Sequence, residues 1–336
     1  MSPQPPGSTG PSASAATAAT VAATAAASAA TSGTSGTSGT SGTSGTASIG
    51  TPAEAALSPW REAWHVFRGN KAALVGLGLL AVVILAMTFG PGLYGVEPFD
   101  IAAGPFTEPF TDPAVWLGTD YLGRDVLAGM LIGGRATLLV GLSAAVLAVG
   151  IGITVGALAG YFGGWVDTVL SRLTELFQVL PSLLFAMVLV SLFTPSLTTV
   201  VFAIGIVAWT GTARLARAEF LRLRHMEYAN AARAMGAGPL RLMLREILPN
   251  AMPPLIVSAS LIVGAAILFE AGLSFLGLSD ANVMSWGLMI GSNRRNILEC
   301  WWAVTFPGLG IFATVLAVSL IGDGLNDAFN PKLHRR

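Results

Sequence analysis

Six long apolar segments, separated by polar stretches, dominate the chain from residue 72 onward. Each reaches or approaches the roughly 20 residues that an α-helix needs to cross a bilayer. The segments are Ala72–Phe89, Ala136–Gly160, Val169–Phe193, Leu197–Ala213, Pro254–Phe275 and Val304–Gly322. The pattern predicts an all-α polytopic membrane protein with six transmembrane helices. Pro181 lies inside the third segment and predicts a kink there.

The first 71 residues follow two other patterns. Residues 1–56 are of low complexity and include a Thr-Ser-Gly repeat from Thr31 to Thr46. Such a stretch cannot bury enough apolar surface to offset its ordering entropy, so we expect a disordered extension. Residues 57–71 then bring charged side chains, together with aromatic residues at helical spacing (Trp60, Trp64 and Phe67). This second pattern predicts an interfacial amphipathic helix.

Composition supports a membrane protein. Hydrophobic residues make up 53% of the 336 residues and charged residues only 11%, whereas soluble domains carry about 25% charged residues. The single cysteine, Cys300, excludes a disulfide within the chain.

The distribution of charge predicts the topology. Residues 214–250 hold seven arginines and three glutamates, whereas residues 90–134 hold six acids and one base. Because cytoplasmic loops carry an excess of Lys and Arg, we place 214–250 inside and 90–134 outside. Residues 72–89 form the first span, 135–323 hold the other five, and 324–336 form a cytoplasmic tail. Both termini are then cytoplasmic.

The basic segment 214–250 has a pattern of its own. A short helix from Met226 to Met235 is followed by Gly236, which suits the left-handed position just past a helix end. Pro239 suits the first position of a second helix, and Pro249 is expected to end that helix. Between the two prolines, an apolar stripe at helical spacing comprises Leu240, Met243, Leu244 and Ile247. On periodicity alone, the stripe packs either on the chain's own membrane helices or on a partner.

The order of these residues resembles the EAA loop of bacterial ABC-importer permeases. The matching positions are Asn230-Ala231-Ala232, then Gly236, then Leu248-Pro249. Asn230 stands where the family usually has Glu. The resemblance implies that this loop carries a coupling helix, at about residues 239–247, which docks into a groove of a separate ATPase subunit.

A second stretch, residues 117–127, resembles the extracytoplasmic signature of the dipeptide/oligopeptide permease branch, C-type subunit. It contains Asp120, Gly123, Arg124 and Asp125. Taken alone, Arg124 and Asp125 read as a solvated turn pair. The resemblance implies a type I importer permease fold in which this loop packs over the outer mouth or meets a binding protein.

A few ionisable side chains fall at membrane depth. Asp167, Arg172 and Glu175 begin the third span, where Arg172 is expected to pair with one of the two acids. Glu270 lies late in the fifth span, near the outer side. A buried membrane carboxylate is either functional or a structural cap, and both readings stay open.

The resemblance also implies cofactors and partners. No Gly-x-x-x-x-Gly-Lys-Ser/Thr loop occurs in the chain, so ATP and Mg²⁺ are expected on partner ATPase subunits. The other expected partners are a second homologous permease, an extracytoplasmic binding protein and the lipid bilayer of a bacterial cytoplasmic membrane, with no nucleic acid. Di- or oligopeptides are the expected substrates, although related permeases import nickel chelates or haem-like molecules.

Two other classes of function are less compatible with the sequence. An intramembrane enzyme needs a nucleophile and base, or a metal cluster, at membrane depth. The three histidines, His65, His225 and His334, lie far apart in predicted cytoplasmic segments, and we expect no metal site. A proton-coupled secondary transporter should carry more intramembrane acids than Glu175 and Glu270.

Overall fold

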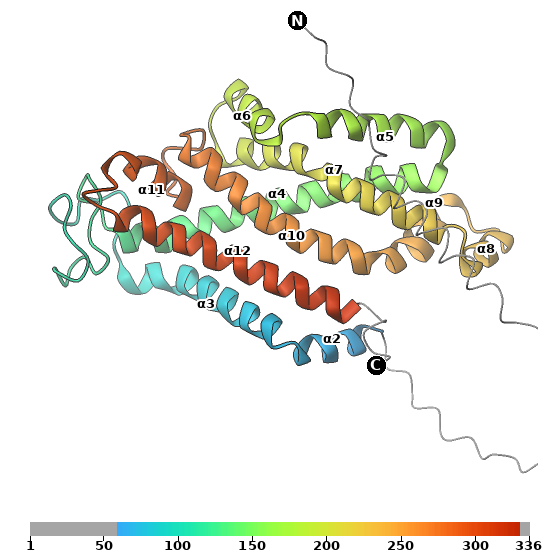
Figure 1. Ribbon diagram of the computed structural model, residues 1–336, viewed down its shortest axis with the longest axis horizontal. Helices are drawn as coiled ribbons and strands as arrows, with labels where there is room; N and C mark the ends of the chain where they lie inside the picture. Colours follow the sequence, from blue (N-terminus) through green and yellow to red (C-terminus); the bar gives the residue numbers. More distant parts are fainter. Residues whose placement is uncertain (1–58, 330–336) are drawn as a thin grey trace, which may run out of the picture. The chain divides into compact units, whose positions relative to one another are not determined.

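A computed structural model describes residues 59–329, and these residues are mostly helical (Figure 1). The expectations for the 1–56 extension and for the last seven residues lie outside the described part. Within it, five continuous helical runs are long and apolar enough to cross a membrane, and a bent helix pair supplies a sixth if it counts as one span. The predicted all-α membrane class is confirmed. The helices are α2 (Pro59–Gly69), α3 (Lys71–Tyr94), α4 (Val126–Phe162), α5 (Gly164–Val179), α6 (Ser182–Leu192), α7 (Leu197–Leu223), α8 (Glu227–Ala234), α9 (Pro239–Arg241), α10 (Leu248–Phe275), α11 (Trp286–Asn293) and α12 (Trp302–Phe329).

The packing of α4 against α7 is the most extensive helix contact in the described chain. Glycines at four-residue intervals on α4, namely Gly152, Gly156 and Gly160, make the close approach possible. A Cβ on Gly156 would overlap the carbonyl of Ala213, and a Cβ on Gly160 would overlap that of Arg217. Small residues of this kind let membrane helices pack backbone to backbone.

A second group of helices is formed by α12 with α3 and α10. Asn70 joins the start of α3 to the end of α12. The Asn70 side chain accepts a 3.1 Å hydrogen bond from the backbone N–H of Ala73, which caps α3, and its Nδ2 donates to Asp327 on α12 at 2.9 Å. The short helix α2 also contacts α12, with Phe67 buried and stacked on the exposed Trp64.

Several helices extend beyond their predicted limits. The loop predicted to lie outside, which we call the outer loop, spans 95–125 and not 90–134, because α3 continues to Tyr94 and α4 starts at Val126. The helix α7 continues to Leu223, so the predicted start of the cytoplasmic loop at 214 is also wrong, as is a tail from 324, because α12 runs to Phe329. These helix ends contain polar residues or glycine, so a hydropathy pattern does not include them in a span. Helical backbone hydrogen bonds can nevertheless form there.

The third predicted span is broken, not merely kinked. Helices α5 and α6 meet at an angle of 89°. Leu180 adopts an extended conformation at the break, as expected for the residue before a proline.

The predicted helix stop at Pro249 is wrong. A helical run continues from Pro239 to Phe275 through a π-helical turn, Leu242–Ile247. The Leu248 N–H bonds to the Met243 carbonyl, five residues back, so Pro249, which has no N–H, follows a turn whose bonding is already shifted. The span therefore does not begin at Pro254 either, because that residue lies inside α10.

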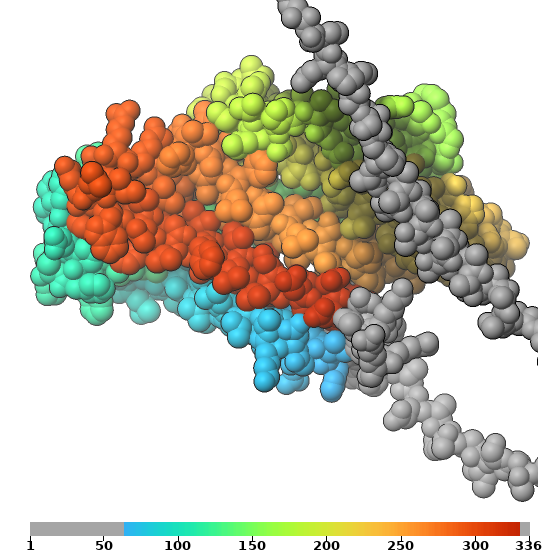
Figure 2. Space-filling model, viewed as in Figure 1, coloured from blue at the N-terminus to red at the C-terminus, as the bar shows by residue number. Residues whose placement is uncertain are grey.

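The outer loop and the α8–α9 segment lie at opposite ends of the helical bundle (Figures 1 and 2). Asp125, the last loop residue, caps the start of α4. At the other end of α4, the carbonyls of Gly160 and Tyr161 accept hydrogen bonds from Arg224, which precedes α8. This separation agrees with the opposite charge of the two segments.

Candidate functional site

The turn between α8 and α9 has the predicted geometry. Gly236 has a φ of 87°. Its N–H bonds to the Arg233 carbonyl at 3.0 Å, and the Ala237 N–H bonds to the Ala232 carbonyl at 3.1 Å. This pair of bonds is the Schellman motif, which ends a helix with a glycine in the left-handed region. Pro239 then occupies the first position of α9, as predicted.

The predicted apolar stripe of this segment is divided. Leu240 is 69% exposed and Leu244 is 53% exposed, whereas Met243 and Ile247 are buried. The expectation of one shared face is wrong because the π-helical turn contains more residues than the 3.6 of an α-helix, which shifts the periodicity. Met243 and Ile247 pack on the chain's own helices, in a cluster that includes Phe220, Ala232 and Leu255.

The side chains left exposed form what we call the coupling surface: Met235, Leu240 and Leu244, flanked by Arg241 and Arg245. Met235, at 82% exposed, lies just before Gly236. Three large apolar side chains beside two cations on a short helical segment are typical of a docking surface.

The EAA-like positions of α8 also differ in exposure. Ala231 is exposed, whereas Ala232 is buried. Asn230 is exposed, and its two polar groups are used locally. Its Oδ1 accepts from Arg233 Nη1 at 2.9 Å, and its Nδ2 donates to the His225 carbonyl at 3.3 Å.

In the outer loop, Asp120 organises a tight turn. Its Oδ1 accepts from the backbone N–H groups of Leu122 at 2.8 Å and Arg124 at 2.9 Å. Gly123, with a φ of 80°, completes the turn. Burial raises the pKa of Asp120 above its ordinary value, although the surrounding N–H groups and Arg124 oppose this shift.

Arg124 and Asp125 are not a solvated pair. Asp125 is buried and caps α4, because its Oδ1 accepts from the N–H groups of Leu127 and Ala128. The Tyr94 hydroxyl donates to its Oδ2 at 2.5 Å. The Arg124 guanidinium lies 5.1 Å from the centroid of the Phe99 ring.

A cavity of about 410 Å³ opens between the loop and α11. Asp120, Arg124 and Asp125 line it from the loop, and Met289, Ser292 and Asn293 line it from α11. The loop is also fixed to α12, since Trp302 Nε1 donates to the Thr119 carbonyl at 2.9 Å. The predicted loop residues therefore gather at one site.

Glu270 is fully buried on α10. Its Oε1 accepts from the Ser274 hydroxyl at 2.6 Å, while Oε2 accepts no hydrogen bond from the described residues. The hydroxyls of Ser285 and Thr137 lie near the carboxyl group. Because Ser285 caps α11 and Thr137 belongs to α4, the carboxyl group lies where three helices meet.

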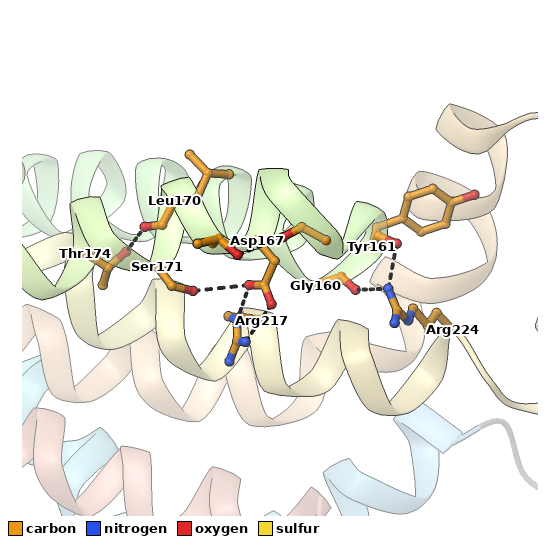
Figure 3. Close-up of polar contacts among 10 residues, drawn as sticks. Gly160, Tyr161, Asp167, Leu170, Ser171, Thr174, Arg217 and Arg224 are labelled. Atoms are coloured by element: carbon orange, nitrogen blue, oxygen red, sulfur yellow. Dashed lines mark hydrogen bonds and ion pairs between the residues drawn. The ribbon is translucent and has the colours of Figure 1, made fainter.

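The sequence indicated only part of the ionic contacts at the end of the bundle that carries α8. Arg172 pairs with Glu175 at 2.7 Å, one of the two expected pairs. Asp167 pairs instead with Arg217 of α7, 50 residues later in the chain (Figure 3). Helical spacing shows only contacts within one helix, so it gave no signal for this pair.

Comparison with known proteins identifies the family of the chain. Residues 152–335 match the family described as binding-protein-dependent transport system inner membrane component, and residues 58–113 match the N-terminal TM domain of oligopeptide transport permease C. The chain is 40% identical to the di/tripeptide transport system permease protein DppC of Pseudomonas aeruginosa, over 85% of this chain and 97% of that protein.

Two further relatives come from other bacteria. The dipeptide permease DppC of Alkalihalophilus pseudofirmus is 39% identical over 83% of this chain and 91% of its own length. The oligopeptide permease OppC of Bacillus subtilis is 35% identical over 84% and 93%. A solved MetNI methionine ABC transporter aligns with 59% of this chain and 96% of its own chain, at 17% identity and a TM-score of 0.47, which is too low to carry an argument.

These findings define a membrane-embedded subunit of an ATP-driven importer. The chain belongs to the family of binding-protein-dependent transport system inner membrane components, and is a permease subunit of an ABC importer. It is a multi-pass inner-membrane protein, and ATP is hydrolysed by a separate subunit.

Proposed function

We propose that this permease forms half of a pathway that imports di- or oligopeptides, paired with a second, homologous permease. The observation that carries the substrate class is the similarity to the di/tripeptide, dipeptide and oligopeptide permeases, at 35–40% identity over more than four-fifths of the chain. The match of residues 58–113 to the oligopeptide permease C model supports the same class.

The coupling surface is our candidate for the ATPase contact. Leu240 and Leu244 are exposed, whereas Leu242, Met243 and Ile247 of the same helical segment are buried, so the two exposed leucines are available to a partner. ATP and Mg²⁺ would bind to the ATPase subunits, and closure of the ATPase pair would displace this segment. The Schellman turn at Gly236 and the helical run from Pro239 into α10 would carry that displacement into the bundle.

The outer loop is our candidate for the contact with an extracytoplasmic binding protein. It presents Arg124 and Asp120 around the 410 Å³ cavity, at the end of the bundle opposite to the coupling surface. This arrangement supports a topology with both termini and the α8–α9 segment in the cytoplasm.

Uptake into proteoliposomes tests the substrate class. The permease would be reconstituted with the second permease, the ATPases and the binding protein encoded beside it, with ATP enclosed and a radiolabelled dipeptide outside. We expect ATP-dependent uptake that unlabelled di- and tripeptides reduce by competition. Absence of dipeptide uptake, together with ATP-dependent uptake of a labelled nickel chelate or haem by the same vesicles, would contradict the peptide proposal but not the assignment to the importer family.

A further inference from the structure

A polar cluster at the cytoplasmic end joins the segment before α8 to helix α5 (Figure 3). It contains Asp167 of α5, Arg217 of α7 and Arg224, which follows the last residue of α7. None of these three residues belongs to the coupling surface or to the EAA-like motif.

The first contact in the cluster attaches the segment before α8 to the end of α4. Arg224 Nη1 donates to the carbonyls of Gly160 and Tyr161 at 3.1 and 3.0 Å. A cation at these last carbonyls of α4 is favoured by the helix dipole. Arg224 also contacts the residues that follow it. Its Nε donates to His225, and its carbonyl accepts from Arg233 of α8 at 3.5 Å. A displacement of α8 therefore reaches α7 and α4 together.

The second contact attaches α5 to α7. Arg217 and Asp167 form a two-point ion pair, in which Nε bonds Oδ1 and Nη2 bonds Oδ2 at 2.7 Å. The Ser171 hydroxyl also donates to Oδ1. Asp167 lies in the first turn of α5, where a carboxylate is favoured. A paired guanidinium and carboxylate fix both distance and orientation, which a single charge contact does not.

The first turns of α5 bury no side chain completely, and only farther along does Phe177 pack on Trp209 of α7, with ring centroids 5.5 Å apart. Helix α5 joins α4 through Gly163 and Gly164, which both have positive φ values, 66° and 53°. A Cβ on Gly164 would meet open space, whereas a Cβ on Gly163 would lie 2.9 Å from Arg224 Nη1, so Arg224 of the same cluster contacts this junction. At its other end α5 turns by 89° into α6, and its main helix contacts are with α4 and α7.

We propose that the Asp167–Arg217 ion pair is a latch that makes α5 move with the cytoplasmic end of α7. When the α8–α9 segment is displaced during transport, the latch causes the α5–α6 pair to change position with α7. The inference rests on the proposed function, in which the ATPases move the coupling segment. Asp167 and Arg217 act here as positioning residues, because their charged groups bond to each other and hold α5 to α7.

The test compares the amount of peptide transported per ATP hydrolysed in the reconstituted four-component importer. Asp167→Asn and Arg217→Gln should assemble and hydrolyse ATP while the transport-to-hydrolysis ratio falls by about fivefold or more, the low end of typical couplings between sites. The exchanged pair, D167R with R217D, should recover part of that loss, because the ion pair can form in the reverse direction. The matched control is Glu175→Gln, which removes the exposed Arg172–Glu175 pair within α5 and should leave the ratio unchanged.

A spectroscopic readout separates the latch from the substrate proposal. Spin labels on exposed positions Leu176 of α5 and Arg222 of α7 would report their distance in nucleotide-free and vanadate-trapped complexes. In the otherwise unaltered protein the distance should be the same in both states, and in Asp167→Asn it should change on trapping. Because no peptide is needed, a wrong substrate assignment leaves this result intact. A normal transport ratio in both single variants, or a label distance that Asp167→Asn leaves unaltered in both states, would overturn the latch.

Discussion

Leu240 and Met243 lie three residues apart in one helical segment, yet Leu240 is 69% exposed and Met243 only 6%. Between them, at Leu242, a π-helical turn begins, and Met243 lies inside this turn. This relationship divides the segment into a face that holds it to the permease and a face that remains free for a partner.

Truncation of the two faces should therefore have opposite effects. Leu240→Ser and Leu244→Ser should change the stability of the isolated permease by no more than about 0.5 kcal/mol, but weaken ATPase binding by about 1 kcal/mol or more each. Met243→Ala should instead cost about 2–5 kcal/mol of stability by opening a cavity. Thermal unfolding in detergent and titration with purified ATPase measure the two quantities. Equal effects of Leu240→Ser and Met243→Ala on unfolding would contradict the division.

Gly236 should be sensitive to any side chain for conformational reasons alone. Its φ is 87°, and a Cβ there would meet nothing within 4 Å. Replacement by Ala should cost about 1–2 kcal/mol, Asn should be tolerated better, and Val should uncouple ATP hydrolysis from uptake while the protein still inserts. Gly238 is the matched control, because it also has free space but a φ of −69°. Normal uptake with Gly236→Val, or equal loss with Gly238→Val, would show that the left-handed turn is not needed for coupling.

The contact between α4 and α7 predicts a contrast between two glycines of one helix. Gly156→Ala should destabilise the permease by about 1–3 kcal/mol, because the added methyl group overlaps the Ala213 carbonyl and α7 must shift. Gly150→Ala should be neutral or slightly stabilising, because its Cβ meets open space. Thermal melts of the two variants in the same detergent measure the difference. A stability loss of the same size in both would mean that close packing at Gly156 does not hold the pair together.

The outer loop should loosen as pH rises. Burial raises the folded-state pKa of Asp120 above its ordinary value of 3.8, so the loop is favoured while the carboxyl is protonated. That stability is complete below the ordinary value and is lost as pH rises through the raised pKa. Asp120→Asn keeps an acceptor oxygen for the Leu122 and Arg124 N–H groups and should remove this dependence. Hydrogen exchange of loop amides, corrected for intrinsic rates, measures it, with exposed Glu108→Gln as control. A pH dependence that survives in Asp120→Asn would assign the effect to another group.

Cys300 should not react with maleimide in the folded protein. It is fully buried, its Sγ donates to the Asn296 carbonyl at 3.3 Å, and burial raises the pKa of the thiol. Labelling should appear only after denaturation in SDS, as mass spectrometry of the intact chain can show. Rapid labelling of the native protein would contradict the burial, and would also mean that Cys300 must be replaced before spin labels are introduced elsewhere.

Much of the fold was predictable because it depends on local patterns. Hydropathy located the membrane segments, and the Gly236 turn and the Pro239 start followed from backbone preferences of single residues. The outer site was found through the family motif that includes Asp120 and Asp125. The glycine-containing start of α4 and the polar end of α12 were missed, because capping by Asp125 and contacts such as Asn70–Asp327 stabilise helix that hydropathy does not detect.

Other features depend on contacts that sequence spacing does not contain. The π-helical turn before Pro249 contradicts the usual rule for proline and moves Met243 and Ile247 inward. The Asp167–Arg217 pair joins residues that only the packing of α5 on α7 brings together. Glu270 was noticed as a membrane carboxylate, but its place among the Ser274, Ser285 and Thr137 hydroxyls required three helices to be positioned.

The most direct test of the account is a co-purification. The tagged chain would be expressed with the proteins encoded beside it, purified through the tag, and assayed for ATP hydrolysis with and without binding protein and a dipeptide. We expect a complex of this permease, a second permease and ATPase subunits, whose hydrolysis rises when binding protein and peptide are added together. A chain that purifies alone, with no ATPase activity attached, would contradict the central claim that this permease is driven through its coupling surface.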